Sequence, residues 1–335
     1  MSSPSENQLV IRGCVSVFVQ GRFSRYCTCR FFFRTSCLKE NRPMILFPNI
    51  KINLGLRVGA TRPDGYHDIV TVMVPVGWCD ILEITPARRG LATTLTVTGL
   101  APACPPEKNL VMKAFKAVEA RCGSLPPVDI RLHKIIPDGA GLGGGSSDAA
   151  FTVRGLDSLF SLGLSDADMA DISATVGSDC PFFIYNRPML ATGRGTDLAD
   201  VRVNTGGISA LAIVKRRGEG VSTAQAYAGI ASRADCDSDA ARLVDALSEP
   251  VRMWNSSGAV LNDFEPSVFA RRPDVEQAKA MLSDAGAVFA AMSGSGAAVF
   301  GLFENAKMAE AAVAGITDCD TFVAEVPDAF GLVER

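Results

Sequence analysis

Residues 135–150, "IIPDGAGLGGGSSDAA", point to chemistry because most of this backbone carries almost no side chain. Glycine lets a ligand approach the backbone closely and tolerates positive φ angles. N–H groups that lead into the start of a helix bind anions, and the helix dipole strengthens that binding. A flexible linker is the alternative, but helical spacing follows at once at Ala149, Val153, Leu156 and Phe160. We therefore predict a phosphate-binding loop made of Pro137, Gly139, Ala140, Gly141, Leu142, Gly143, Gly144, Gly145, Ser146 and Ser147.

Two common phosphate loops do not fit this stretch. Gly139, Gly141 and Gly144 match the G-x-G-x-x-G pattern of dinucleotide-binding folds. Such a fold requires a second strand that ends in an acidic residue about 20 residues further on, and Asp157 instead lies within the predicted helix. The G-x-x-x-x-G-K-[ST] pattern of the Walker loop is absent from the sequence. The stretch therefore belongs to another type of phosphate site.

Regular elements must hold this loop in place, and their order divides the chain into two α+β domains. Before residue 193 we expect strands at 45–58 and 69–84, β-rich sequence at 91–98, a helix at 109–121 and a strand at 128–133. After residue 207 we expect a strand at 208–214, helical segments, a helix at 274–284, strands at 287–292 and 297–302, a helix at 305–315 and a strand at 320–326. The second order is typical of a split βαβ unit with a helical insert. Glycines and charges at 193–207 indicate a domain boundary.

Composition limits the classes of protein to which this chain can belong. With 335 residues, of which 47% are hydrophobic and 21% charged, the chain has the composition of a globular protein. It has no run of 18 apolar residues, which argues against a membrane span. The chain after residue 43 is acidic, which argues against general nucleic-acid binding. The ten cysteines form no C-x-x-C pair and only two histidines are present, which excludes a zinc ribbon and a multi-histidine metal site.

Residues 1–43 differ from the rest of the chain in composition. They are basic and aromatic without sustained periodicity, whereas Met44 opens the strand-like run "MILFPNIKINLGLRV". We interpret residues 1–43 as a disordered or non-native leader and Met44 as the biological start. A targeting peptide is the alternative, because arginine and serine are frequent there. We expect a cytoplasmic protein with reduced cysteines, or a plastid protein if the leader is a transit peptide.

Three further stretches identify the type of phosphate loop. They are "PNIKINLGLRVGATRPDGYHDIVTV" at 48–72, "VGSDCPFFI" at 176–184 and a second glycine–serine loop, "AMSGSGAAVFGLF", at 291–303. In the second of these stretches we expect Asp179 at the end of a helix, against an apolar strand. Together with the first glycine loop, they resemble the GHMP kinase superfamily over essentially all of residues 44–335. The R-P-D-G-Y-H sequence at 62–67 resembles the corresponding stretch in one branch of this superfamily. The kinases of that branch phosphorylate 4-diphosphocytidyl-2-C-methyl-D-erythritol in the non-mevalonate isoprenoid pathway.

The resemblance implies a two-domain α+β GHMP kinase fold. Residues 44–203 would form an N-terminal ribosomal-protein-like domain with the phosphate loop, and residues 204–335 a C-terminal ferredoxin-like split βαβ domain. ATP would be the co-substrate, accompanied by Mg²⁺, and the 2-hydroxyl of the methylerythritol unit would accept the phosphoryl group. The implied partner is this small molecule, with neither nucleic acid nor membrane, and we expect a monomer or a weak homodimer.

Two charged residues would carry the catalysis. The resemblance implies that Asp179 is the general base and that Lys51 is its cationic neighbour. Phosphoryl transfer depends mainly on positioning and charge stabilisation, with a carboxylate that accepts the hydroxyl proton. A lysine beside that carboxylate favours its ionised form and stabilises charge that develops on the transferred group. The expected chemistry therefore agrees with the residue types.

The same resemblance implies a site for a cytosine base. Tyr66 offers an aromatic face and His67 a hydrogen-bonding ring, which suit the face and the edge of a pyrimidine. Tyr227 matches a second aromatic residue that closes over the base, and Thr223 lies near it in "GVSTAQAY". Asn53 matches an asparagine that contacts the substrate. The predicted substrate-binding residues are therefore Asn53, Tyr66, His67, Thr223 and Tyr227.

Two other stretches are expected to support the site rather than to bind a ligand. We interpret "LNDFEP" at 261–266 as architectural and Gly294–Gly296 as a support for the phosphate loop. Asp148 stands where many members of the family carry asparagine, and it adds negative charge near the phosphates.

Two alternative functions were considered. A homoserine or mevalonate-type kinase is the nearest alternative, but those enzymes lack the R-P-D-G-Y-H stretch. A non-catalytic ligand sensor is disfavoured because Lys51 and Asp179 are both present.

Overall fold

The computed structural model describes residues 43–88, 90–100, 104–218, 220–227, 230, 237–326 and 329–330. The predictions for the leader, residues 1–43, lie outside these ranges apart from Pro43. Within the ranges, every helix is too short or too polar to cross a membrane.

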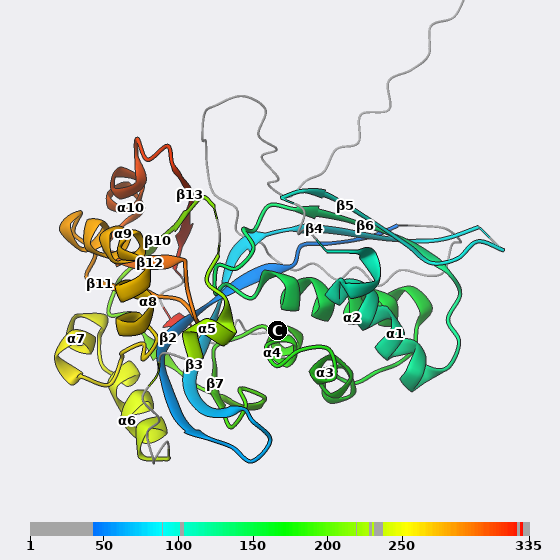
Figure 1. The fold of residues 1–335 in the computed structure, drawn as a ribbon, viewed down its shortest axis with the longest axis horizontal. Helices are drawn as coiled ribbons and strands as arrows, with labels where there is room; N and C mark the ends of the chain where they lie inside the picture. The colour runs from blue at the N-terminus through cyan, green and yellow to red at the C-terminus, as the bar shows by residue number, and fades with distance from the viewer. Residues whose placement is uncertain are drawn as a thin grey trace, which may run out of the picture. The chain divides into compact units, whose positions relative to one another are not determined.

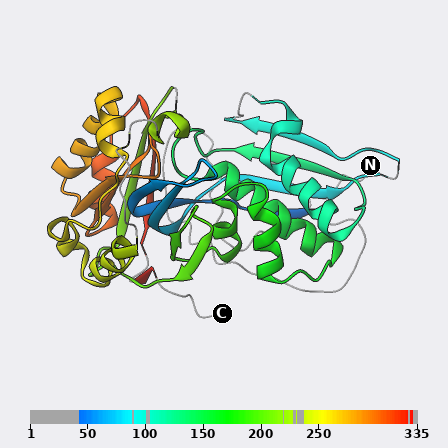
Figure 2. The same ribbon diagram turned by 60° about the horizontal axis from the view of Figure 1, so that its bottom comes forward.

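The first sheet carries the segment that leads into the glycine loop. Side chains along "VDIRLHK" alternate between a buried and a more exposed face, as the sequence predicts. Two helices lie along one face of this sheet and two more pack beside them (Figures 1 and 2). The strand order is β1 (Met44–Leu46), β4 (Ile81–Pro86), β6 (Val128–Lys134) and β5 (Thr94–Gly99), with only β5 and β6 parallel. The helices are η1 (Pro106–Lys108), α1 (Leu110–Cys122), α2 (Gly144–Phe160), α3 (Asp166–Ala174) and α4 (Cys180–Tyr185).

The second sheet carries Lys51 and Asn53 on a long antiparallel hairpin. Lys51 pairs with Pro75 and Asn53 with Met73, so both polar residues lie in the middle of a buried strand. The hairpin turn holds Tyr66, which therefore lies at one end of the sheet. The strand order is β2 (Asn49–Thr61), β3 (His67–Cys79), β7 (Met189–Thr192) and β8 (Asp197–Asp200), and all neighbours are antiparallel.

The third sheet has the strand order of a split βαβ fold, as predicted for the last third of the chain. The order is β11 (Phe289–Met292), β12 (Val299–Phe303), β10 (Ala210–Arg216) and β13 (Cys319–Glu325), all antiparallel. The associated helices are α8 (Glu265–Arg271), α9 (Pro273–Asp284) and α10 (Ala306–Val313). The insert after β10 contains α5 (Thr223–Tyr227), α6 (Asp237–Ser248), η2 (Val251–Met253) and α7 (Trp254–Ser257). β9 (Val203–Asn204) pairs with β14 (Ala329–Phe330).

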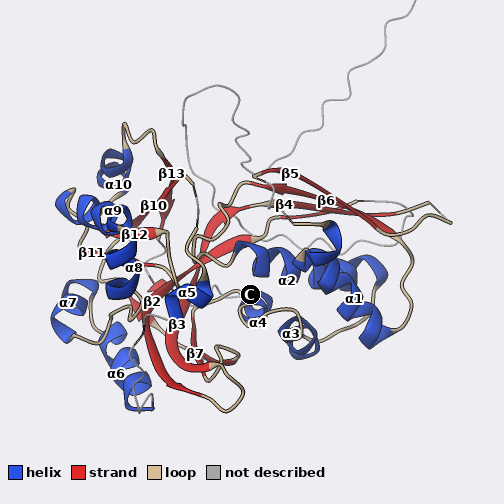
Figure 3. Cartoon of the chain, viewed as in Figure 1, coloured by secondary structure: helices blue, strands red, loops and turns tan. Residues whose placement is uncertain are grey.

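One apolar core joins the second and third sheets. It includes Ile52 of β2, Val72 of β3, Ile213 of β10 and Phe300 of β12, all buried. Figure 3 shows β2 and β3 between the helices α6 to α10 on one side and α1 to α4 on the other. The hairpin that carries Lys51 is thus fixed by the packing of the third sheet as well as by its own.

Three element predictions were wrong in detail. The expected strand 45–58 is divided between β1 and β2, and the expected strand 69–84 is divided at Asp80, whose N–H donates to Pro48 O. The run "PFFI" after Asp179 is part of helix α4 rather than a strand. A short apolar run does not distinguish a buried helix from a strand, and the proline in the first turn suits a helix start.

Candidate active site

The glycine loop turns its carbonyl groups into the protein. Gly139 O accepts from Val221 N, Ala140 O accepts from Ala298 N at 3.0 Å, and Leu142 O accepts from Lys51 N at 3.0 Å. The first N–H groups of α2 follow directly, and the N–H groups in the first turn of a helix have no intrahelical acceptor. With its acceptors engaged and its donors at a helix start, the loop has the polarity of an anion site.

The second glycine–serine loop supports the first. Ser293 Oγ donates to Gly141 O at 3.0 Å, and Asn262 Nδ2 donates to Met292 O and Gly294 O. Gly141 has a φ of +73°, and a Cβ there would lie 2.1 Å from Ser293 O. Only glycine fits at this contact, because the neighbouring atom belongs to the backbone of the other loop. The supporting role expected for Gly294–Gly296 and the architectural role expected for 261–266 agree with these contacts.

Lys51 lies at the centre of a buried polar chain. Its Nζ donates to Asn53 Oδ1 at 2.5 Å and to Gly141 O at 3.0 Å. Asn53 Nδ2 in turn donates to Thr71 Oγ1 at 2.9 Å, and the Thr71 hydroxyl donates to Gly55 O at 2.6 Å. This chain fixes the amide of Asn53 so that its oxygen faces the ammonium group.

Asp179 faces the same ammonium group from the start of α4. Its Oδ2 lies 3.7 Å from Lys51 Nζ, and its side chain is one-third exposed whereas that of Lys51 is buried. Burial lowers the pKa of Lys51 from its usual value, while the negative charge of Asp179 acts in the opposite direction. The structure therefore brings together the two residues predicted to be catalytic, with the carboxylate on the more accessible side.

His67 and Tyr227 form an aromatic stack near Asp179. Their ring centroids are 5.1 Å apart with an interplanar angle of 23°, and Phe264 packs edge-on against Tyr227 at 4.9 Å. Burial raises the pKa of Tyr227 to about 12, and the negative charge of Asp179 contributes to that shift. His67 Nδ1 lies 3.0 Å from Gly59 O, so a protonated Nδ1 would leave Nε2 as an acceptor. Tyr227 thus lies within electrostatic range of the Asp179 carboxylate.

Tyr66 contacts Arg194 rather than packing within this stack. Its side chain is half exposed, and the Arg194 guanidinium carbon lies 3.8 Å from the centroid of its ring. Thr223 begins α5, the helix that also carries Tyr227, but its side chain is outside the described part of the structure. Of the predicted substrate residues, Asn53 therefore lies with Lys51, His67 with Tyr227, and Tyr66 with Arg194.

A buried ionic cluster lies beneath the glycine loop. Lys134 Nζ donates to Asp80 Oδ2 at 2.5 Å and to Asp148 Oδ2 at 2.7 Å, and all three side chains are buried. Asp80 Oδ1 also accepts from the N–H groups of Ile135 and Ile136. The cluster ties the end of β6 to the start of α2, so it holds both ends of the loop.

The protonation of this cluster differs from that of exposed groups. Burial raises the pKa of Asp148 to about 7, with Lys134 opposing the shift and Asp80 adding to it. Burial alone would lower the pKa of Lys134, but the attraction of Asp148 and Asp80 and their hydrogen bonds together raise it. Asp148 Oδ1 and Ser147 Oγ are buried without a hydrogen-bond partner among the described residues. The Asp148 carboxylate is thus hydrogen-bonded through only one of its two oxygens, so the cost of burying its charge is only partly offset.

Sequence reasoning missed several members of these groups. Thr71 and Asp80 each interrupt an apolar run, and a lone polar residue in a buried strand is a usable sign of a specific hydrogen bond. The sequence around Arg194 does not indicate a functional role, since "GRG" is typical of any tight turn. The contact between Arg194 and Tyr66 depends on the pairing of β3 with β7, which periodicity does not predict.

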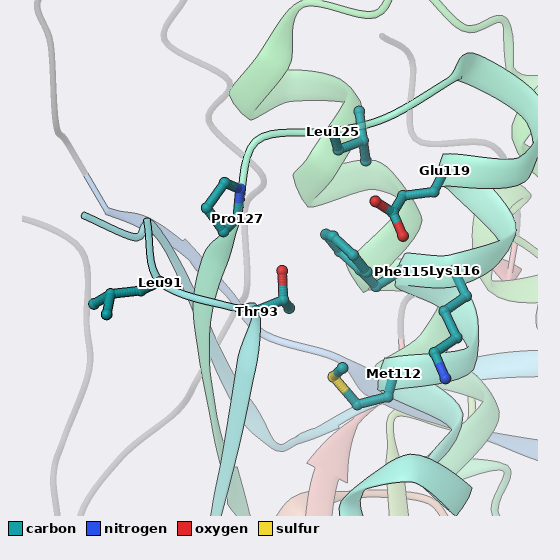
Figure 4. Close-up of a pocket in the computed structure, with 8 residues that line it drawn as sticks. All are labelled: Leu91, Thr93, Met112, Phe115, Lys116, Glu119, Leu125 and Pro127. Carbon is teal, nitrogen blue, oxygen red and sulfur yellow. The ribbon is translucent and has the colours of Figure 1, made fainter. Parts of the chain in front are cut away.

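An apolar pocket of about 380 Å³ lies between α1 and the loops that flank β5 and β6. Figure 4 shows Met112, Phe115, Lys116 and Glu119 of α1 facing Thr93 and Pro127. Leu91 and Leu125 complete its lining. None of these residues belongs to the glycine loop, the Lys51 chain or the aromatic stack, so the pocket is separate from the candidate site.

Family models match both parts of the chain that form this site. The model of the GHMP kinases N terminal domain matches residues 109–187, which contain the glycine loop and Asp179. The model of the GHMP kinases C terminal domain matches residues 243–319, which contain the second glycine–serine loop.

Individual relatives are more specific. The 4-diphosphocytidyl-2-C-methyl-D-erythritol kinase of Parabacteroides distasonis is 45% identical to this chain over 262 residues, which cover 78% of this chain and 92% of that protein. The crystal structure of a 4-(cytidine 5'-diphospho)-2C-methyl-D-erythritol kinase aligns with a TM-score of 0.66 and 28% identity, over 84% of this chain and 98% of that one. A homoserine kinase from Cytophaga hutchinsonii aligns with a TM-score of 0.65 over 90% of this chain and 99% of its own, but at 18% identity it shows the fold alone.

These similarities confirm the α+β GHMP kinase fold and the resemblance inferred from the sequence. They extend over the glycine loop, the segment with Asp179 and the second glycine–serine loop. The chain belongs to the 4-diphosphocytidyl-2-C-methyl-D-erythritol kinase family of GHMP kinases.

Proposed function

We propose that this chain transfers the γ-phosphoryl group of ATP to the 2-hydroxyl of 4-diphosphocytidyl-2-C-methyl-D-erythritol. The observation that carries the proposal is the position of Lys51. Its Nζ donates to Gly141 O of the glycine loop and lies 3.7 Å from Asp179 Oδ2. One cation thus links the loop expected to hold the phosphates with the carboxylate expected to accept the proton.

In the proposed reaction, Asp179 accepts the proton of the substrate hydroxyl. The hydroxyl oxygen then forms a bond to the γ-phosphorus as the bond to the bridging oxygen of ADP breaks. Lys51 is held by Asn53 and by the loop, so its charge is already in place when negative charge develops on the transferred group. Because Lys51 makes these contacts within the protein, it acts without reorganisation at the moment of reaction.

The glycine loop fits the phosphates of ATP. Its carbonyl groups are engaged by Lys51, Ser293 and Ala298, which leaves the N–H groups at the start of α2 for phosphate oxygens. Any side chain at Gly141 would also disrupt this surface. Mg²⁺ would enter with ATP and share the charge of its phosphates. Pro137, Gly139 and the other residues of the predicted loop are therefore proposed as the ATP site.

The aromatic residues fit a pyrimidine. We assign Tyr66, His67 and Tyr227 to the cytosine base, because stacked aromatic faces and a ring acceptor suit its face and edge. Asn53, whose amide is fixed by Lys51 and Thr71, lies next to the proposed reaction centre. Thr223 would contact the substrate from the start of α5. The monomeric or weakly dimeric state and the cytoplasmic location remain predictions from the sequence.

The rates of ADP release with three acceptors test this function. The purified chain is assayed with ATP and, separately, 4-diphosphocytidyl-2-C-methyl-D-erythritol, mevalonate and homoserine at equal concentrations. We expect the cytidyl substrate to exceed the other two by about 100-fold or more in kcat/KM, because they lack the base that the aromatic site would hold. A higher rate with mevalonate or homoserine would contradict the proposal, and so would the absence of turnover with all three.

A further inference from the structure

Arg194 occupies one face of the Tyr66 ring. It lies in the turn between β7 and β8, far from Tyr66 in sequence, and its guanidinium carbon is 3.8 Å from the ring centroid. A cation within about 6 Å of a ring centroid is attracted by the negative face of that ring. The contact therefore covers one face of Tyr66 and leaves the side chain half exposed.

The turn that carries Arg194 is fastened to β3. Gly193 O accepts from Ile69 N at 2.8 Å, and Gly195 N donates to Thr192 O at 2.9 Å, which closes the turn. Gly193 has a φ of +61°, and a Cβ there would lie 2.5 Å from Asp197 Oδ2. The turn is thus built for one backbone path, and that path places Arg194 beside the hairpin turn of β2 and β3.

The hairpin turn is itself held by charge and by hydrogen bonds. Tyr66 N donates to Asp64 Oδ1 at 3.1 Å, Tyr66 O accepts from Arg62 N at 2.6 Å, and Arg62 pairs with Asp64 and Asp68. The hydrogen bond from Tyr66 N–H lowers the pKa of Asp64, and the charges of Arg62 and Arg194 add to that effect. The backbone of Tyr66 is therefore fixed, and Arg194 is the group that restricts its ring.

We propose that Arg194 is a positioning residue that orders the Tyr66 ring for the cytosine of the substrate. This inference depends on the proposed function, in which Tyr66 contacts the base. An exposed aromatic side chain loses conformational entropy when it stacks on a ligand. A ring that is already restricted by a neighbouring group loses less entropy on binding. Arg194 closes one face of the ring, so a flat ligand stacks on the other. Arg194 thus contributes to substrate affinity through Tyr66.

A double-mutant cycle tests this inference on the full-length enzyme. The variants are Arg194→Ala, Tyr66→Ala, the double variant and Arg194→Lys, with Arg131→Ala as a matched exposed-arginine control. Arg194→Ala is expected to raise KM for the cytidyl substrate by about twofold to thirtyfold, the range that corresponds to cation–π energies. Both kcat and KM for ATP should change by less than about twofold. Arg194→Lys, which keeps the cation but not the planar guanidinium, should recover part of the affinity.

The cycle separates failure of this inference from failure of the proposed function. In the Tyr66→Ala background, loss of Arg194 should raise KM for the cytidyl substrate by less than about twofold, because the ring through which Arg194 acts is gone. An unchanged KM in Arg194→Ala, together with a raised KM in Tyr66→Ala, would overturn the role of Arg194 alone. Equal effects of Arg194→Ala in both backgrounds would also overturn it. An unchanged KM in Tyr66→Ala would overturn the aromatic base site and, with it, the inference.

Discussion

The glycine loop and the aromatic end of the candidate site are held in place by different means. The loop is fixed by backbone hydrogen bonds to a second loop, by Lys51 and by the buried cluster of Asp80, Lys134 and Asp148. The aromatic end consists of side chains that stack on one another, His67 on Tyr227 and Arg194 on Tyr66, at or near the surface. The first end presents main-chain groups to a ligand, and the second presents rings.

This difference predicts different responses to substitution. A phosphate chain is the same in every nucleotide, and a rigid main-chain surface suits a ligand that never varies. The base of the substrate must be distinguished from other bases and from acceptors that carry no base. Side chains that stack on the base make this distinction. Changes to the loop should therefore damage folding and ATP use together, whereas changes to the aromatic end should alter substrate affinity in graded steps. Asp179 connects the two ends, because it faces Lys51 and its charge also acts on Tyr227.

The largest effect of a substitution on activity is expected at Asp179. Asp179→Asn should lower kcat by about 10²–10⁴, because an amide accepts no proton from the substrate hydroxyl. The affinity for ATP should stay nearly unchanged, since the glycine loop and Lys51 are retained. Steady-state kinetics together with an ATP-binding titration measure both quantities. A variant that keeps more than about half of the wild-type kcat would contradict the assignment of the base.

The glycine loop should tolerate no side chain at Gly141. Gly141→Ala would place a Cβ 2.1 Å from Ser293 O at a φ of +73°, so one of the two loops must move. Strain of this kind lowers the free energy of unfolding by about 1–3 kcal/mol, so we expect a lower Tm, and the displaced loop should also lower kcat/KM for ATP. Gly77→Ala is the matched control, because Gly77 has no atom near its added Cβ. Equal melting temperatures and equal ATP use in the two variants would show that the loop is not held as described.

The buried cluster should make stability depend on pH. The pKa of Asp148 is raised to about 7 in the folded chain, so between its unfolded value and pH 7 the folded state binds a proton that the unfolded state does not. Stability therefore falls as the pH rises from about 4 to about 7, at a rate of up to about 1.4 kcal/mol per pH unit. Asp148→Asn should remove much of this fall. Urea unfolding at pH 5, 6, 7 and 8 measures it, with the exposed Asp171→Asn as control. Parallel pH profiles for wild type and Asp148→Asn would refute the buried-charge account.

The sequence was most informative where local pattern decides structure. The alternation in β6, the helical spacing after the glycines and the order of elements after residue 207 all follow from side-chain periodicity. The "PFFI" segment was misjudged because a short apolar run fits a buried helix and a buried strand equally. The break at Asp80 was missed because its cause, the hydrogen bonds to Pro48, Ile135 and Ile136, lies outside the strand.

The candidate site divides in the same way. Lys51, Asn53 and the glycine loop were found because their motifs are contiguous, and the structure places them in direct contact. Arg194 and Thr71 were missed because each joins the site through pairing between distant segments. Motifs predict which residues take part, whereas the long-range partners that orient them depend on sheet register.

The separation of the two ends is tested most directly by the kinetics of Tyr227→Ala toward both substrates. Stacking on a base is worth about 1–3 kcal/mol, so KM for the cytidyl substrate should rise by roughly 5- to 150-fold. KM for ATP should stay within about twofold of wild type, and Tyr227→Phe, which keeps the ring, should behave like wild type for both substrates. The contradictory result is a loss of ATP affinity with unchanged affinity for the cytidyl substrate, which would mean that the two ends have been assigned to the wrong ligands.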